Sequence, residues 1–122
     1  MARTVAIYTV IHQPRRLKLP AALIPTASSK AELVAAMEGV LFDEAANQRY
    51  LAKVAEKCYR PALSMFAELA DAGLAFNVGA SFSWLRQLEL WDPALREQFA
   101  AFVARDRVEL IGVEPYHSFL FF

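Results

Sequence analysis

Apolar residues run almost without interruption from Thr4 to His12 near the beginning of the chain. The run is rich in β-branched residues and too short to cross a membrane, so it predicts a buried strand of a parallel sheet. Pro14 ends this strand, because proline has no N–H to donate to a neighbouring strand. His12 and Gln13 are therefore expected at the strand's carboxyl end, where α/β folds bind their ligands.

Helical spacing follows after a loop that contains Pro20 and Pro25. Ser29 and Glu32 have the spacing of a capping box, which predicts a short helix through about Glu38. The length of the preceding loop fits a wall of a binding cleft and a surface excursion equally well.

A longer helical pattern begins after Asp43, the expected N-cap. Pro61 fits the first turn of a second helical segment, and Gly73 is expected to end that segment in a left-handed conformation. Cys58 falls on the apolar stripe, which predicts a packing role. The apolar positions of the two segments are Leu51, Val54, Ala55 and Cys58, then Ala62, Phe66, Leu69 and Ala70.

The remaining pattern predicts two more strands with helices between them. Alternating apolar residues indicate a strand over Leu74 to Ser83, followed by a short helix over Trp84 to Leu90. Asp92-Pro93 begins another helix. Its expected buried stripe is Leu95, Phe99, Phe102 and Val103. A strand over Arg107 to Val113 completes a β, α, β, α, β order, which predicts an α/β fold with a parallel sheet and right-handed βαβ connections.

Composition limits the partners and the setting. The chain has 122 residues, 57% of them hydrophobic, which is more apolar surface than one small domain easily buries. Thirteen basic and thirteen acidic residues give a net charge of zero without a basic stripe, which argues against nucleic acid as a partner. A single cysteine, no signal-peptide pattern and no membrane-length apolar run favour a cytoplasmic protein away from membranes.

Two stretches resemble glycoside hydrolase family 57. The segment VIHQPRRLKL, at 10–19, is similar to the family's opening strand, which ends in His-Gln-Pro. The segment FDEAANQRYLAKVAEKCYRPA, at 42–62, resembles the α-amylase-like branch, where a similar Phe-Asp, VAEKCY and Pro-Ala pattern precedes the second strand. The resemblance implies that residues 1–122 are the N-terminal part of an incomplete seven-stranded (β/α) barrel domain, with no second domain.

The end of the chain carries the same resemblance. Glu109 lies in an apolar strand and is followed by Glu114-Pro115-Tyr116-His117-Ser118, similar to the family's Val-Glu strand and Tyr-Tyr-His-Ser turn. This chain has one tyrosine where many relatives have two, and Asp106 where glycine is common. The resemblance implies substrate contacts from His12, Gln13, Glu109, Tyr116 and His117, and Trp84 is a further candidate for stacking on a sugar.

The activity that the resemblance implies is retaining hydrolysis or transfer at an α-glycosidic bond, of the α-amylase or 4-α-glucanotransferase type. Such a reaction needs a nucleophilic carboxylate and a second carboxyl that acts as acid and then base. In the family both lie on later strands, so no catalytic residue is assigned here and the chain by itself is expected to be inactive. The expected ligand is an α-glucan or oligosaccharide, with no cofactor and no metal.

Each candidate also has a structural interpretation. His12 is suited to a hydrogen bond at a strand end, and Glu109 to an ion pair with His12 or Arg107. Asp43 fits a helix cap and Trp84 the core. A sugar site formed by His12 and Glu109 requires both side chains to converge at the carboxyl end of neighbouring strands.

Three classes of function remain open at this stage. The first is the N-terminal part of an α-amylase-like enzyme, and the second is a non-catalytic remnant that binds glucan or a partner chain. The third is a metal-dependent hydrolase with ligands among His12, Glu109, Glu114 and His117, although no short-spaced metal motif is present. Open sheet edges and the apolar Ser118–Phe122 segment predict pairing with further strands of a longer chain or with a second copy.

Overall fold

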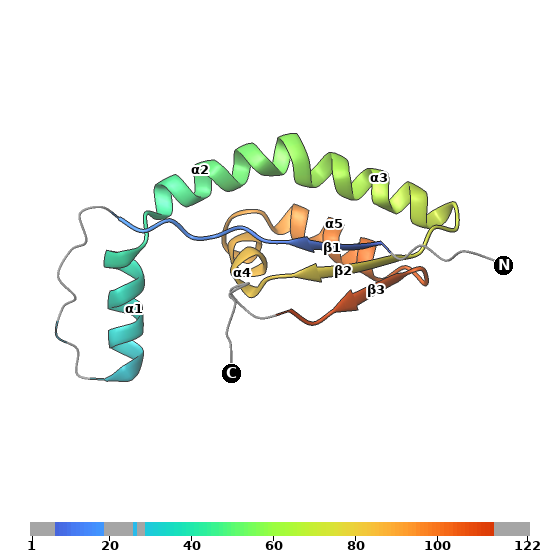
Figure 1. The fold of residues 1–122 in the computed structure, drawn as a ribbon. Helices are drawn as coiled ribbons and strands as arrows, with labels where there is room; N and C mark the ends of the chain where they lie inside the picture. Colours follow the sequence, from blue (N-terminus) through green and yellow to red (C-terminus); the bar gives the residue numbers. More distant parts are fainter. Residues whose placement is uncertain (1–6, 19–25, 27–28, 114–122) are drawn as a thin grey trace. The chain divides into compact units, whose positions relative to one another are not determined.

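A computed structural model of the chain describes residues 7–18, 26 and 29–113. Within these residues a parallel sheet has the strands β1 (Tyr8–Ile11), β2 (Phe76–Ala80) and β3 (Val108–Ile111) in the spatial order β1-β2-β3 (Figure 1). The α/β class with parallel strands and helical connections is therefore confirmed. Residues 4–6 of the predicted first strand lie outside the described residues.

The helices lie between the strands in the order that the sequence predicted. They are α1 (Lys30–Leu41), α2 (Glu44–Val54), the π-helical turn η1 (Ala55–Tyr59), α3 (Arg60–Asp71), α4 (Phe82–Trp91) and α5 (Pro93–Val103). The chain divides into two compact units, one formed by Met1–Pro14 with Leu51–Phe122 and the other by Arg15–Tyr50.

The first unit carries its helices on one face of the sheet (Figure 1). Strands that follow one another in space and in sequence, joined by right-handed connections, place every connecting helix on the same side. Side chains that alternate toward that side form the core with the helices. The fully or nearly buried members of this core include Phe76, Val78, Trp84, Leu88, Leu95, Phe99, Phe102 and Val108.

The opposite face of the sheet is open among the described residues. The register aligns Tyr8 of β1, Asn77 of β2 and Glu109 of β3, so their side chains share this face. Tyr8 and Glu109 are both exposed. Gly79 leaves room on this face for the neighbouring side chains, since a Cβ at this position would lie 3.0 Å from the Tyr8 hydroxyl. A one-sided sheet of this kind is the arrangement found in part of a (β/α) barrel.

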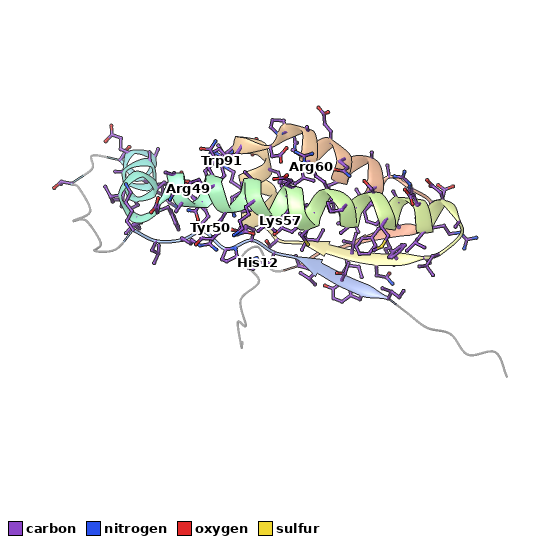
Figure 2. The ribbon with its side chains drawn as sticks, turned by 90° about the horizontal axis from the view of Figure 1, so that it is seen from above. His12, Arg49, Tyr50, Lys57, Arg60 and Trp91 are labelled. Atoms are coloured by element: carbon purple, nitrogen blue, oxygen red, sulfur yellow. The ribbon has the colours of Figure 1, made fainter. Side chains whose placement is uncertain are left out.

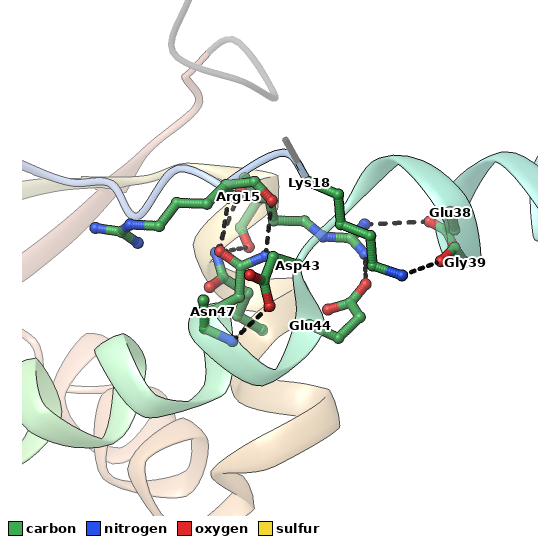
Figure 3. Close-up of polar contacts among 11 residues, drawn as sticks. Arg15, Lys18, Glu38, Gly39, Asp43, Glu44 and Asn47 are labelled. Carbon is green, nitrogen blue, oxygen red and sulfur yellow. Dashed lines mark hydrogen bonds and ion pairs between the residues drawn. The ribbon is translucent and has the colours of Figure 1, made fainter. Parts of the chain in front are cut away.

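The second unit is organised around the arginines that follow Pro14 (Figure 3). The Arg15 guanidinium forms ion pairs with Glu38 and Glu44, at 3.3 Å for Glu38. It also lies 3.9 Å from the centre of the Phe42 ring, a cation–π distance. The Asn47 side chain accepts a hydrogen bond from the Arg16 backbone N–H at 2.7 Å. These contacts tie the segment after the His-Gln-Pro triplet to α1 and α2.

The predicted caps of the second unit are confirmed. The Ser29 hydroxyl accepts the Glu32 backbone N–H at 3.2 Å, and α1 continues past the expected end at Glu38 to Leu41. The Asp43 carboxylate accepts the Ala46 N–H at 2.9 Å. Both contacts satisfy N–H groups that have no partner within their own helix.

The helix from α2 to α3 is continuous, and its π-helical turn is placed immediately before Pro61. Proline has no N–H and its ring crowds the carbonyl four residues earlier, so a widened turn accommodates it with less strain than a regular one. The Arg60 N–H accordingly bonds to the Ala55 carbonyl, five residues back. The extra residue turns Cys58 to the surface, so its predicted packing role is wrong.

The same shift of phase changes the buried face of α3. Leu63 and Ala70 are its buried residues, whereas Leu69, which was expected on the apolar stripe, is exposed. Gly73 follows with φ of 100°, the left-handed conformation predicted for the helix end. The Asp92 carboxylate caps α5 by accepting the Leu95 N–H at 3.0 Å, as predicted.

Two leucines on α4 test the position of the core. We expect Leu88→Ala, at a side chain with 0% exposure, to lower the free energy of unfolding by about 2–5 kcal/mol. Leu90→Ala, at a side chain with 46% exposure, should change it by less than about 0.5 kcal/mol. Urea denaturation of both variants followed by circular dichroism measures the difference. Equal losses would show that α4 does not pack as described.

Candidate functional site

His12 lies directly after β1, at the carboxyl end of the sheet (Figure 2). Its Nδ1 is 2.8 Å from the hydroxyl oxygen of Ser81, the first residue after β2. The Ser81 backbone N–H bonds to the Ile11 carbonyl at 3.0 Å, which extends the pairing of the two strands to this point. The imidazole is therefore held by the end of the neighbouring strand.

Gln13 is nearly buried, and its backbone carbonyl accepts two hydrogen bonds. The Ser83 hydroxyl donates to this oxygen at 2.8 Å and the Gln87 side-chain amide donates at 2.7 Å. Both donors belong to α4 and are buried. Two donors on one carbonyl fix the backbone between His12 and Pro14, because breaking them would leave buried polar groups unpaired.

The Gln13 side chain is also occupied. Its amide oxygen accepts the Tyr59 hydroxyl at 2.9 Å. Burial, and to a smaller extent the neighbouring Cys58, raises the pKa of Tyr59 to about 12, so the phenol remains a donor at neutral pH. The π-helical turn is what directs Tyr59 inward. Gln13 therefore serves as an anchor in this structure, and its predicted contact with substrate stays a prediction.

A pocket of about 240 Å³ opens beside His12. One wall is β1 from Thr9 to His12, and the other is formed by Cys58, Tyr59 and residues of α3. Its lining is mostly apolar. The pocket places apolar surface next to His12, and small-molecule sites commonly combine an apolar lining with a few polar groups.

Glu109 does not reach His12. It pairs with Asn77, and through Asn77 with Tyr8, four positions before His12 along β1. Four residues of strand span about 13 Å, so the expected convergence of the two side chains on one sugar is wrong for this structure. Glu109 is exposed on the open face of the sheet and forms no ion pair with a described residue. Its exposure explains how a carboxylate is tolerated in an apolar strand.

The other candidates separate into two groups. Trp84 has 0% exposure and packs edge-on against Tyr59 and Phe99, with ring centres 5.4 and 5.0 Å apart. It is a core residue with no surface for a sugar ring. The interpretation of Trp84 as a core residue is therefore correct, and its predicted stacking on a sugar is wrong. Tyr116 and His117 lie outside the described residues.

The sequence model of glycosyl hydrolase family 57 matches residues 6–122. The chain belongs to this family. Searches of curated proteins and of solved structures return no match. The match covers the strand-end histidine, the Gln13 anchor and the strand of Glu109, in agreement with the resemblance seen in the sequence.

Clustered metal ligands and membrane-length apolar helices are both absent from the described part of this family 57 chain. No group of three or more histidine, cysteine, aspartate or glutamate side chains is placed there to hold a metal ion. None of the described helices has the length and apolar character needed to span a bilayer.

Sequence reasoning missed the polar residues that hold the triplet in place, namely Ser81, Ser83, Gln87 and Tyr59. Ser81 carried a usable signal, because serine before a helical pattern is a common N-cap, and its hydroxyl accepts the Trp84 N–H at 3.3 Å. Ser83 and Gln87 gave none, since their partner is a backbone carbonyl about 70 residues away in sequence.

The Tyr59–Gln13 bond predicts a measurable loss of stability. Tyr59→Phe removes the donor and leaves a buried amide oxygen unsatisfied, which should cost about 1–3 kcal/mol of unfolding free energy. Tyr50→Phe is the matched control, because Tyr50 is exposed and the Arg16 guanidinium contacts the face of its ring, which phenylalanine keeps. Chemical denaturation of both variants gives the comparison. Equal effects would contradict the anchoring role.

The raised pKa of Tyr59 predicts how stability changes at alkaline pH. A group that binds its proton more tightly when folded contributes full stability below its unfolded pKa of about 10. That contribution is lost as the pH rises from about 10 to 12. Unfolding midpoints between pH 8 and 11.5 should therefore fall more steeply for the unmodified chain than for Tyr59→Phe. Parallel curves would contradict the shift.

Proposed function

We propose that the chain is the N-terminal part of the catalytic domain of a retaining glycoside hydrolase that acts on α-glucans, of the α-amylase or 4-α-glucanotransferase type. The observation that carries the proposal is the match to glycosyl hydrolase family 57 over residues 6–122. The fixed position of His12 supports it, since this residue is held beside a pocket at the carboxyl end of the strands. A cytoplasmic setting is part of the same proposal.

In this proposal the chain supplies substrate contacts and no catalytic carboxylate. The His12 side chain contacts a hydroxyl of one glucose unit. The apolar wall of the adjacent pocket contacts the C–H groups of that glucose unit. Glu109 contacts a different glucose unit from the open face of the sheet, because its distance along the strand direction separates it from His12. Tyr116 and His117 contribute further contacts. The nucleophile and the acid/base come from later strands of the barrel in a longer chain, and a second copy of this chain is an alternative partner only for pairing with its open sheet edges.

Binding to maltoheptaose tests the substrate contact. His12→Ala should weaken binding about 2- to 10-fold, the effect of losing one hydrogen bond worth about 0.5–1.5 kcal/mol. Glu97→Gln, at an exposed position on α5, should leave the affinity unchanged. Titration calorimetry of both variants measures the difference. Equal affinities would remove His12 from the site, and no binding by the unmodified chain would remove the substrate proposal for this chain.

An assay of hydrolysis tests whether the catalytic carboxylates lie outside this chain. A chain without the nucleophile and the acid/base loses the covalent route, so purified residues 1–122 should release no reducing sugar from starch or maltoheptaose. Turnover that is abolished by Glu109→Gln would overturn this expectation and would assign the catalytic role to this chain. Binding without turnover by the chain is also what the second class of function, a glucan-binding remnant, would give. Adding the strands encoded downstream separates the two, because only the enzyme gains activity.

A further inference from the structure

Ser81 stands out because one buried hydroxyl serves two elements. The side chain has 0% exposure, between the end of β2 and the beginning of α4. Its oxygen accepts the Trp84 backbone N–H at 3.3 Å, which caps α4, and lies 2.8 Å from Nδ1 of His12. The hydroxyl therefore links the first turn of a helix to the imidazole at the end of a neighbouring strand.

The direction of the second bond follows from counting donors and acceptors. A serine hydroxyl has one hydrogen to donate and two lone pairs that accept. The Trp84 N–H uses one lone pair, and the buried hydrogen needs an acceptor. Among the described residues, Nδ1 of His12 is the acceptor that the geometry offers. If Nδ1 instead carried a proton and donated to Ser81, the hydroxyl hydrogen would have no acceptor among those residues.

We propose that Ser81 is a positioning residue that donates its hydroxyl hydrogen to Nδ1 of His12 and holds the neutral ring in the Nε2–H form. The bond on one ring nitrogen decides which proton the other carries. In this form Nε2 is a hydrogen-bond donor, so His12 binds acceptor oxygens and does not act as a base. The assignment of Ser81 stands on the geometry, and the statement that the acceptor is a sugar oxygen rests on the proposed function.

The tautomer can be read directly from nitrogen chemical shifts. The chain has two histidines, His12 and His117, so ¹⁵N-labelled histidine gives two ring spin systems, and His117→Gln identifies the signals of His12. At a pH where the ring is neutral, we expect a protonated Nε2 and an unprotonated, hydrogen-bonded Nδ1. A protonated Nδ1 in the unmodified chain would overturn the proposal without the need for any Ser81 variant.

Substitutions separate this role from a general effect on folding. Ser81→Ala should move the Nδ1 resonance toward that of an unbonded nitrogen, and Ser81→Thr, which keeps the hydroxyl, should restore it. Ser64→Ala is the control, because it removes a serine hydroxyl whose hydrogen-bond partner is Gln98 on another helix. An Nδ1 resonance that is unchanged in Ser81→Ala, or that moves equally in Ser64→Ala, would overturn the proposal.

Adding maltoheptaose distinguishes failure of this inference from failure of the proposed function. Sugar binding at His12 should shift the Nε2 resonance and leave Nδ1 in place. The expected tautomer together with no response to sugar would support the positioning role of Ser81 and contradict the glucan contact. A protonated Nδ1 together with a response to sugar would support the contact and contradict the positioning role.

Discussion

The backbone carbonyl of Gln13 is the point on which the carboxyl end of the sheet depends. A strand that runs into proline has no further ladder bonds to hold its end, so its position must be fixed by other groups. Ser83 and Gln87 supply them from the first two turns of α4, and both donors are buried. Because these bonds cannot be exchanged for bonds to water, strand and helix move together. The position of His12 is therefore fixed by the bonds to the carbonyl of the next residue, Gln13.

Pro61 also affects the position of Gln13, through the helix that contains Tyr59. Its missing N–H favours the π-helical turn before it, and this turn directs Tyr59 into the interior, where its hydroxyl reaches the Gln13 amide. A residue in one helix thus sets the environment of a strand end that is more than 40 positions away in sequence. The raised pKa of Tyr59 reflects how far the phenol has been withdrawn from water.

The local features of the fold were predictable because they depend on neighbours in sequence. The caps at Ser29, Asp43 and Asp92 and the left-handed Gly73 follow from short-range chemistry. The parallel direction of the strands follows from the alternation of strands and helices along the chain. The predictions that failed depend on the rotational phase of a helix and on the register between strands. One extra residue in a turn moved Cys58 to the surface, and strand pairing that no local pattern specifies placed Glu109 away from His12.

The π-helical turn also decides where this helix can change length. Each residue advances an α-helix by about 100°, so on a regular helix Leu51 and Leu63 would point about 120° apart. The wider turn over Ala55–Tyr59 absorbs one residue and lets both leucines face one core. Deleting one residue from this turn would leave a regular helix on which the two leucines differ in direction by only about 20°. The turn is therefore the part of the helix that can lose a residue without turning α3 away from the core.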